Sequence, residues 1–348
     1  MGLTIIDYIG NSDKDGNPIG HPIKTINNYI ELFEGIYELQ LIVPLNYKSK
    51  LSFENIYFLN YFQKFKKYNY VLKIINIFRR YNNINKSIKL AQNEVLWFMN
   101  IDFVLFIYLI LNNINKKVII TSYSDEDIKK RHKVLNFFNK TIKKNVESQI
   151  DLYITSNPNF NTKKEDKIVY IPDYIYLEKY KYYEKEFETE DYILCIGVMN
   201  NSKKLVELVE VFNKTNYSLK IVGKFTDLKL LKAIQKNAND NIEIRNEYVD
   251  ESDYYKLISK SKYVILPYKK EYYYNRSSGV LLDSIFLRKT VIAPSFIFEY
   301  NEIEGIKYNK LEELKNKNLI FVHNNLKPFD KEIILNKLSK KLKKLMEE

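Results

Sequence analysis

Short apolar runs alternate with segments of helical periodicity along the whole chain. This alternation is typical of α/β proteins with parallel sheets. In the first half, the apolar runs predict strands at Thr4–Ile9, Glu38–Val43, Asn55–Leu59, Glu94–Phe98, Val118–Thr121, Leu152–Thr155 and Ile168–Ile171. Helices are predicted between them, chiefly at Ile23–Phe33, Phe103–Ile114 and Lys133–Asn145.

The second half predicts a cleaner series of alternating strands and helices. The strands are Tyr192–Ile196, Ser218–Val222, Ile242–Arg245, Tyr263–Leu266 and Thr290–Ala293. The helices between them are Lys203–Asn213, Asp227–Asn237, Ser252–Ser259 and Ser278–Phe286. Such a series predicts a Rossmann-like sheet, whose ligands bind at the carboxyl ends of the strands.

The length of 348 residues is more than one hydrophobic core usually serves, and it predicts two domains. A charged segment low in glycine, Leu177–Glu186, separates the two series. We interpret it as a linker, although its composition also fits a solvated helix face. The predicted domains are residues 1–176 and 177–327. Residues 328–348 predict an amphipathic, lysine-rich helix that could pack back on the first domain.

Composition and charge limit the kinds of partner that the protein is expected to bind. The hydrophobic content of 45% is ample for packed interiors and argues against a disordered chain. The net charge of +12 favours an anionic partner such as a nucleotide diphosphate, an acidic lipid or nucleic acid. Nucleic acid is disfavoured, because the lysines are spread along the chain and no zinc spacing, helix-turn-helix signature or arginine-rich arm accompanies them.

The cysteine content and the apolar segments predict a cytoplasmic location. The single Cys195 lies in an apolar run, which predicts a small buried side chain, and it can form no internal disulfide. The segment Met1–Asp7 lacks the basic and apolar regions of a signal peptide. The apolar stretch Val95–Leu111 is interrupted by Asn100 and Asp102 and is shorter than a membrane span of about 20 residues.

Two glycine-containing turns follow strands of the second series. Gly197 comes directly after a strand and permits a sharp turn, and Lys203 stands at the predicted start of the next helix. A lysine there can meet phosphate oxygens together with the free helix amides. Gly223 and Lys224 follow the next strand in the same way. Each turn taken alone also fits an ordinary strand–helix connection.

A third feature opens the last predicted helix, with the sequence Arg276, Ser277, Ser278, Gly279. Either serine suits an N-cap, and the glycine lets a ligand lie against the first helical turn. The helix amides and the positive helix end favour a diphosphate, to which Arg276 adds a charged fork. Asp283, farther along this helix, could accept hydrogen bonds from ribose hydroxyls. The alternative is an ordinary capped helix with a solvated acid.

In order and spacing, these motifs resemble those of the retaining GT-B glycosyltransferases known as group 1, or family four. The resemblance covers residues 192–295 and is topological over the first 175. Positions that match the family pattern are Gly197, Lys203, Gly223, Pro267 and the stretch 279–294. The sequence departs from the pattern at Val198, Lys204 and Asn275, where the family has an arginine, a glycine and its first glutamate, and at Asp283, which is one methylene shorter than the family's second glutamate.

The resemblance implies an α/β fold of the GT-B class, with two facing Rossmann-like domains, a cleft between them and the C-terminal amphipathic helix. It implies a nucleotide sugar as donor, UDP-linked, a glycan, lipid-linked or protein-linked acceptor, and retention of the anomeric configuration. The residues that would meet the diphosphate are Lys203, Arg276 and the amides of Ser277–Gly279. Asp283 would hold the ribose, and the backbone at Val249 would read the base.

His21 lies in the glycine-containing loop after the first strand. It would face the donor or the acceptor, or else be a solvated loop residue. Cys, His and carboxylate groups do not occur at metal-ligand spacing, so neither a metal nor a cofactor is expected. Cationic side chains and a helix end can carry the charge that a metal ion neutralises elsewhere.

The runs Phe62–Tyr68 and Ile77–Tyr81 mix aromatic and cationic side chains. One interpretation is a patch that touches an acidic bilayer at the inner face of the membrane, where a lipid-linked acceptor would reside. The other is a surface helix whose aromatics face the core.

Two other functions stay open: a degenerate GT-B-like subunit that binds a partner or glycan, and a sugar-nucleotide epimerase. The association state is also open, a homo-oligomer included.

Overall fold

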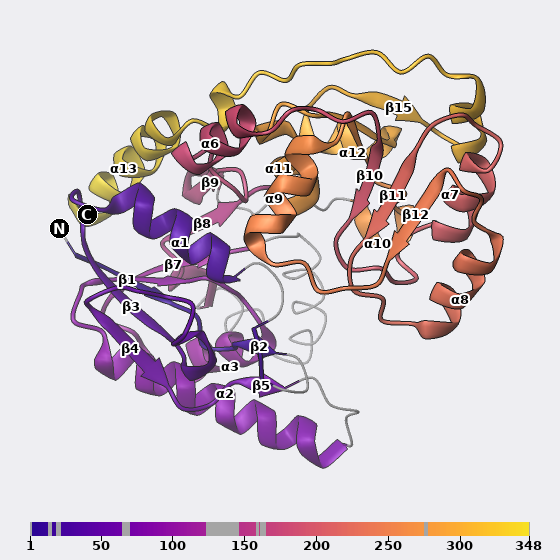
Figure 1. Cartoon of the computed structure of the whole chain (residues 1–348). Helices are drawn as coiled ribbons and strands as arrows, with labels where there is room; N and C mark the ends of the chain where they lie inside the picture. The colour runs from indigo at the N-terminus through magenta and orange to yellow at the C-terminus, as the bar shows by residue number, and fades with distance from the viewer. Residues whose placement is uncertain are drawn as a thin grey trace. The chain divides into compact units, whose positions relative to one another are not determined.

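Two parallel sheets organise the chain, one in each of two units (Figure 1). The computed structural model describes residues 2–12, 16–18, 22–64, 70–122, 146–157, 160, 165–274 and 278–347. Unit 1 consists of Met1–Ile175 and Lys331–Glu348, and unit 2 is Tyr176–Asp330. Each unit has its own apolar core.

Unit 1 contains a seven-stranded sheet in the order β4-β3-β1-β6-β7-β8-β9, and every neighbouring pair is parallel. The strands are β1 (Gly2–Ile6), β3 (Glu38–Pro44), β4 (Ile56–Leu59), β6 (Val95–Phe98), β7 (Lys117–Thr121), β8 (Leu152–Thr155) and β9 (Ile168–Tyr170). The strands predicted in the first half are thus confirmed. β1 ends at Ile6 because the Asp7 carboxylate accepts hydrogen bonds from the amides of Ile9 and Gly10 and turns the chain.

The described helices of unit 1 are α1 (Pro22–Phe33), α2 (Tyr70–Leu90), α3 (Phe103–Leu111) and α13 (Lys331–Glu347). Short strands β2 (Asn11–Ser12) and β5 (Gln63–Lys64) pair with each other, and 3₁₀ turns occur at Leu45–Tyr47 and Glu165–Lys167. The C-terminal helix α13 packs against α1 and β9, and Tyr37 donates a hydrogen bond of 3.0 Å to the Ser339 hydroxyl.

The helix predicted at Lys133–Asn145 lies outside the described residues. Among the helices that the structure describes, none has both the length and the apolar character needed to cross a membrane.

Unit 2 contains a six-stranded parallel sheet in the order β12-β11-β10-β13-β14-β15. The strands are β10 (Ile193–Ile196), β11 (Leu219–Val222), β12 (Ile242–Arg245), β13 (Tyr263–Ile265), β14 (Thr290–Pro294) and β15 (Ile306–Tyr308). The first five confirm the predicted series. The sixth was not predicted, because it has three residues and its central Lys307 is exposed.

The helices of unit 2 are α6 (Glu178–Glu186), α7 (Leu205–Phe212), α8 (Leu228–Asn237), α9 (Glu251–Lys260), α10 (Lys270–Tyr273), α11 (Gly279–Phe286) and α12 (Ser295–Asn301), with 3₁₀ turns at Leu311–Asn316 and Lys327–Phe329. The linker interpretation of Leu177–Glu186 was wrong, because this segment forms α6. Its Tyr180 is fully buried, with its ring edge-on to Phe286 and Tyr255 at centroid distances of 4.9 and 5.6 Å.

Each sheet reverses its winding direction at one pair of neighbouring strands. The chain passes from β1 to β3 on one side and later to β6 on the other, and unit 2 repeats this with β10, β11 and β13. Open parallel sheets bind ligands outside the carboxyl ends of the strands at such switch points. The ends of β1 and β6, and those of β10 and β13, are therefore where a site is expected.

Candidate functional site

Two glycines stand against each other at the carboxyl edge of the unit 2 sheet. Gly197 follows β10 with a φ of 106°, and Gly223 follows β11 with a φ of 148°. A Cβ on Gly223 would lie 1.9 Å from the carbonyl oxygen of Gly197. A Cβ on Gly197 would instead meet Val280 Cγ2 at 3.5 Å and Lys203 Nζ at 3.7 Å. Gly223 is thus required by close backbone approach, whereas Gly197 leaves its open side toward a lysine and the start of α11.

The loop after β10 is tied to both of its neighbours. Met199 forms a bridge with Phe225 in the loop after β11, and Lys203 forms one with Tyr268 in the loop after β13. The Lys204 amide donates to the Pro267 carbonyl at 2.7 Å. These backbone bonds fix the loop at the switch point of the sheet.

The side chain of Lys203 is buried at this point, with 5% of the residue exposed. Its Nζ donates to the Ile196 carbonyl oxygen at 3.2 Å and lies 3.7 Å from Met199 Sδ. Burial lowers the pKa of Lys203, and no carboxylate in the described parts of the chain pairs with it. A buried ammonium without an anion is costly, so the site is suited to a negatively charged ligand.

The N-terminus of α11 lies beside this lysine, because a Cβ on Gly197 would be within 4 Å of both Val280 of α11 and Lys203 Nζ. Ser278 is the N-cap, and its hydroxyl accepts a bond of 3.4 Å from the Leu281 amide. The same hydroxyl is 2.7 Å from that of Tyr268, which burial keeps neutral by raising its pKa. The predicted N-cap and the predicted lysine are therefore brought to the same edge of one sheet.

Asp283 is buried, and its carboxylate is bound by tyrosines. Tyr180 of α6 donates to Oδ1 at 2.8 Å, and Tyr254 of α9 donates to Oδ2 at 3.1 Å. The alternative of a solvated acid was therefore wrong. The two tyrosine hydroxyls therefore occupy positions on this carboxylate that a ribose hydroxyl would otherwise take.

The other residues predicted for the site differ in their exposure, and some of them lie outside the described residues. Lys224 is exposed, and its carbonyl accepts from the Met199 amide at 2.9 Å. Val249 is half-buried and Gly279 is the first residue of α11. His21, Arg276 and Ser277 lie outside the described residues. Cys195 is buried within β10, as its apolar run predicted.

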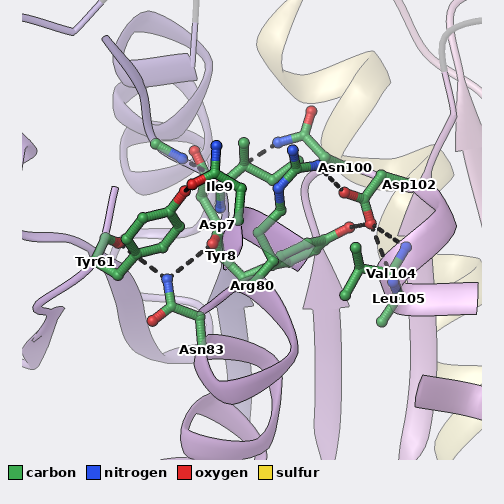
Figure 2. A network of polar contacts seen from close by, with 12 residues as sticks. Asp7, Tyr8, Ile9, Tyr61, Arg80, Asn83, Asn100, Asp102, Val104 and Leu105 are labelled. Atoms are coloured by element: carbon green, nitrogen blue, oxygen red, sulfur yellow. Dashed lines mark hydrogen bonds and ion pairs between the residues drawn. The ribbon is translucent and has the colours of Figure 1, made fainter. Parts of the chain in front are cut away.

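A second polar cluster lies at the switch point of unit 1, where β1 and β6 end (Figure 2). Asp102 caps α3, since its Oδ1 accepts from the amides of Val104 and Leu105 at 2.9 and 3.0 Å. The Tyr8 hydroxyl donates to the same oxygen at 2.8 Å, and Arg80 of α2 pairs with Oδ2 at 2.5 Å. One carboxylate thus joins two helices to the loop after β1.

Asp7 in the same cluster is almost fully buried, and burial raises its pKa. Hydrogen bonds to its carboxylate act in the other direction and lower the pKa. They are donated by the Tyr47 hydroxyl at 2.7 Å and by the amides of Ile9 and Gly10. Asn100 also points toward Asp7, with its Nδ2 at 3.5 Å (Figure 2). This carboxylate orders the loop after β1.

This second cluster and the tyrosines around Asp283 were not predicted from the sequence. A signal was available for Asp102, because an aspartate directly before an apolar helical segment is a common N-cap. Tyr180 and Tyr254 offered none, since they lie 103 and 29 residues from Asp283.

No protein-family model matches the chain, and no curated protein matches it. Solved structures do match over nearly the whole length. The sucrose-phosphate synthase of Thermosynechococcus elongatus is 11% identical, with a TM-score of 0.67, covering 99% of this chain and 98% of its own. HepE of Anabaena, solved in complex with UDP and glucose, is 10% identical, with a TM-score of 0.61, covering 99% and 100%.

The UDP-GlcNAc 2-epimerase of Methanocaldococcus jannaschii is also similar, at 13% identity and a TM-score of 0.54, covering 98% of this chain and all of its own. At such low identity the likeness concerns the fold alone. That fold is GT-B, with a Rossmann-like parallel sheet in each unit, and the predicted fold class is confirmed.

Proposed function

We propose that this protein is a glycosyltransferase that moves a hexose-type sugar from a UDP-linked donor to a glycan, lipid-linked or protein-linked acceptor. The observation that supports this most is Lys203, a buried amine at the switch point of the second sheet without a carboxylate partner among the described residues. A diphosphate would supply the missing negative charge. HepE, which shares the fold, was solved with UDP and glucose.

In the proposed reaction, the bond between the anomeric carbon and the β-phosphate oxygen breaks. A bond from that carbon to the acceptor oxygen forms, and the acceptor hydroxyl passes its proton to the departing phosphate oxygen. Negative charge grows on the departing diphosphate, where the ammonium of Lys203 and the amides at the start of α11 would stabilise it. Arg276 would add its guanidinium, so that no metal is needed, and by resemblance the anomeric configuration is retained.

Asp283 is proposed to hold the ribose after a local exchange. The Tyr254 hydroxyl, bound to Oδ2 at 3.1 Å, would yield to a ribose hydroxyl, and Tyr180 would keep Oδ1. Tyr180 is the better anchor because it is fully buried. The backbone near Val249 would contact the base.

Isothermal calorimetry with UDP tests the donor site. Lys203→Met keeps the length of the side chain but removes its charge, and we expect UDP to bind about tenfold more weakly or worse. The matched control is Lys236→Met on α8, where the lysine is exposed and far along the helix from the strand ends. Equal affinity in the Lys203 variant, or no UDP binding by the unmodified protein, would overturn the proposal.

Two alternative functions are compatible with the same fold, and measurements of turnover distinguish them from the transferase. An epimerase would invert C2 of UDP-GlcNAc without an acceptor, which proton NMR of the nucleotide sugar detects. A degenerate binding subunit would bind UDP or glycan and release no UDP from any donor in a panel of UDP- and GDP-sugars. The transferase predicts release of UDP that depends on both donor and acceptor.

A further inference from the structure

Helix α2 presents an unusual exposed surface near its N-terminal end. Ile74, Ile75, Ile77 and Phe78 have exposed fractions of 42%, 37%, 37% and 67%. Residues three and four apart lie on the same side of a helix, so these four side chains gather over little more than one turn. We call them the α2 apolar patch. Among the residues that the structure describes, exposed large hydrophobics are not as dense anywhere else.

The patch is not part of the core of unit 1. Among the α2 side chains whose burial the structure describes, Asn83, Ile84 and Ser87 are buried, and Tyr81 packs on Tyr108 of α3 with ring centroids 5.0 Å apart. Helix α2 runs along the outside of unit 1 (Figure 1). Its apolar patch therefore leaves a large part of its apolar surface in contact with solvent, and exposed apolar groups of this kind mark interaction sites.

The sequence on either side of the patch carries only positive charge. From Asn55 to Asn93 the sequence has no Asp or Glu, and its cations are Lys64, Lys66, Lys67, Lys73, Arg79, Arg80, Lys86 and Lys89. This segment thus carries a net charge of +8 of the chain's +12. Arg79, Lys86 and Lys89 are exposed on α2.

We propose that the α2 apolar patch and its flanking cations dock unit 1 on an anionic lipid bilayer. A helix with exposed isoleucine and phenylalanine beside lysine and arginine can lie in the interfacial plane, its apolar side chains at the acyl boundary and its cations on lipid phosphates. A segment without acids meets no repulsion from such a surface. Nucleic acid would match the cations but would leave the isoleucines unburied. The proposal stands apart from the transferase activity, and where both hold, a lipid-linked acceptor would lie beside unit 1.

Co-sedimentation of the full chain with vesicles tests the proposal. The two vesicle types are phosphatidylcholine alone and phosphatidylcholine mixed with phosphatidylglycerol. We expect binding to the anionic vesicles only, and we expect salt to weaken it. The double variant Ile75→Ser/Phe78→Ser should bind about tenfold more weakly or worse. Each of Arg79→Gln, Lys86→Gln and Lys89→Gln should weaken binding about fivefold.

The matched control is Leu228→Ser, which removes an equally exposed leucine, at 62%, from α8 of unit 2 and should change nothing. Three outcomes overturn the docking proposal: no binding to anionic vesicles, undiminished binding by the double variant, or an equal loss in the Leu228 variant. If the protein binds an acidic protein but no anionic vesicles, the docking proposal is overturned as well. Circular dichroism of the same samples shows whether the variants are folded. Absence of UDP binding in calorimetry would refute the donor site while leaving the vesicle result intact.

Discussion

Gly223 approaches Gly197 so closely that a Cβ on Gly223 would stand 1.9 Å from the Gly197 carbonyl oxygen. Gly223 also has a φ of 148°, which side chains rarely tolerate. Gly223→Ala must therefore displace the backbone of the loop after β10 and adopt a strained conformation. We expect a loss of about 3 kcal/mol in the free energy of unfolding, measured by urea denaturation.

Gly35→Ala provides the control for this prediction. Gly35 also has a positive φ, of 73°, but a Cβ there would meet nothing within 4 Å. It should cost only the conformational strain, about 1 kcal/mol. If the two alanine variants lose the same stability, the backbone contact between the glycines contributes nothing beyond the φ angle.

Most of the strand ends and helix starts at the carboxyl edge of the unit 2 sheet could be predicted from local sequence. The contacts that their side chains make could not. Gly197, Lys203 and Ser278 were placed at strand ends and a helix start because apolar runs and N-cap residues signal those boundaries directly. By contrast, α6 was interpreted as a linker, because its one buried anchor, Tyr180, is hidden among charged neighbours. The strand β15 was missed because three residues carry too little periodicity.

Tertiary partners explain the remaining misses. The carboxylate of Asp283 looks like a solvated helix acid in the sequence, and its environment is decided by tyrosines on two other helices. The pairing of Arg80 with Asp102 likewise joins α2 to the start of α3 across 22 residues. No pattern within one element specifies such pairs, so they require the fold.

The buried amine of Lys203 should give the free protein a characteristic pH dependence. Its folded pKa is lowered by burial from the ordinary 10.5. Between the lowered value and 10.5, the unfolded chain binds a proton that the folded amine does not, so raising the pH stabilises the fold. Below the lowered value the amine is charged in both states, and the full cost of burying that charge is present.

Lys203→Met removes this contribution. Near neutral pH and in the absence of nucleotide, we expect the variant to be more stable than the unmodified protein, by about 1 kcal/mol or more in the free energy of unfolding. The difference should shrink as the pH rises toward about 10, in urea titrations at a series of pH values. A difference that does not change with pH would show that the amine is solvated or paired in the folded protein.

Asp283 should matter to stability as well as to the nucleotide. Asp283→Ala removes the carboxylate to which two tyrosine hydroxyls donate, and we expect a loss of about 2–4 kcal/mol in the free energy of unfolding. Asp283→Asn can still accept from one hydroxyl and donate to the other, so its loss should be about 1 kcal/mol. Equal losses in both variants would mean that the lost charge, and not the lost acceptor, dominates.

Tyr254→Phe tests the proposed ribose exchange at the same carboxylate. The variant keeps the ring and removes the hydroxyl that donates to Oδ2 at 3.1 Å. If ribose replaces that hydroxyl, the competition disappears and UDP should bind with equal or about fivefold higher affinity by calorimetry. A weaker affinity in a variant with unchanged thermal stability would contradict the exchange and place the ribose elsewhere.

Asp102 is expected to be the most sensitive carboxylate of unit 1, because one side chain both caps α3 and neutralises Arg80. Asp102→Ala removes the cap and leaves a guanidinium that is 21% exposed without its anion, for an expected loss of about 3 kcal/mol. Asp102→Asn keeps a capping oxygen but presents no charge to Arg80, so about half of that loss should remain. The control is Asp250→Ala, which removes an exposed N-cap of α9 bonded to the Asp253 amide at 2.8 Å and should cost about 1 kcal/mol. Urea denaturation of the three variants ranks them, and an Asp102→Ala loss no larger than that of Asp250→Ala would mean that the contact with Arg80 adds nothing to the cap.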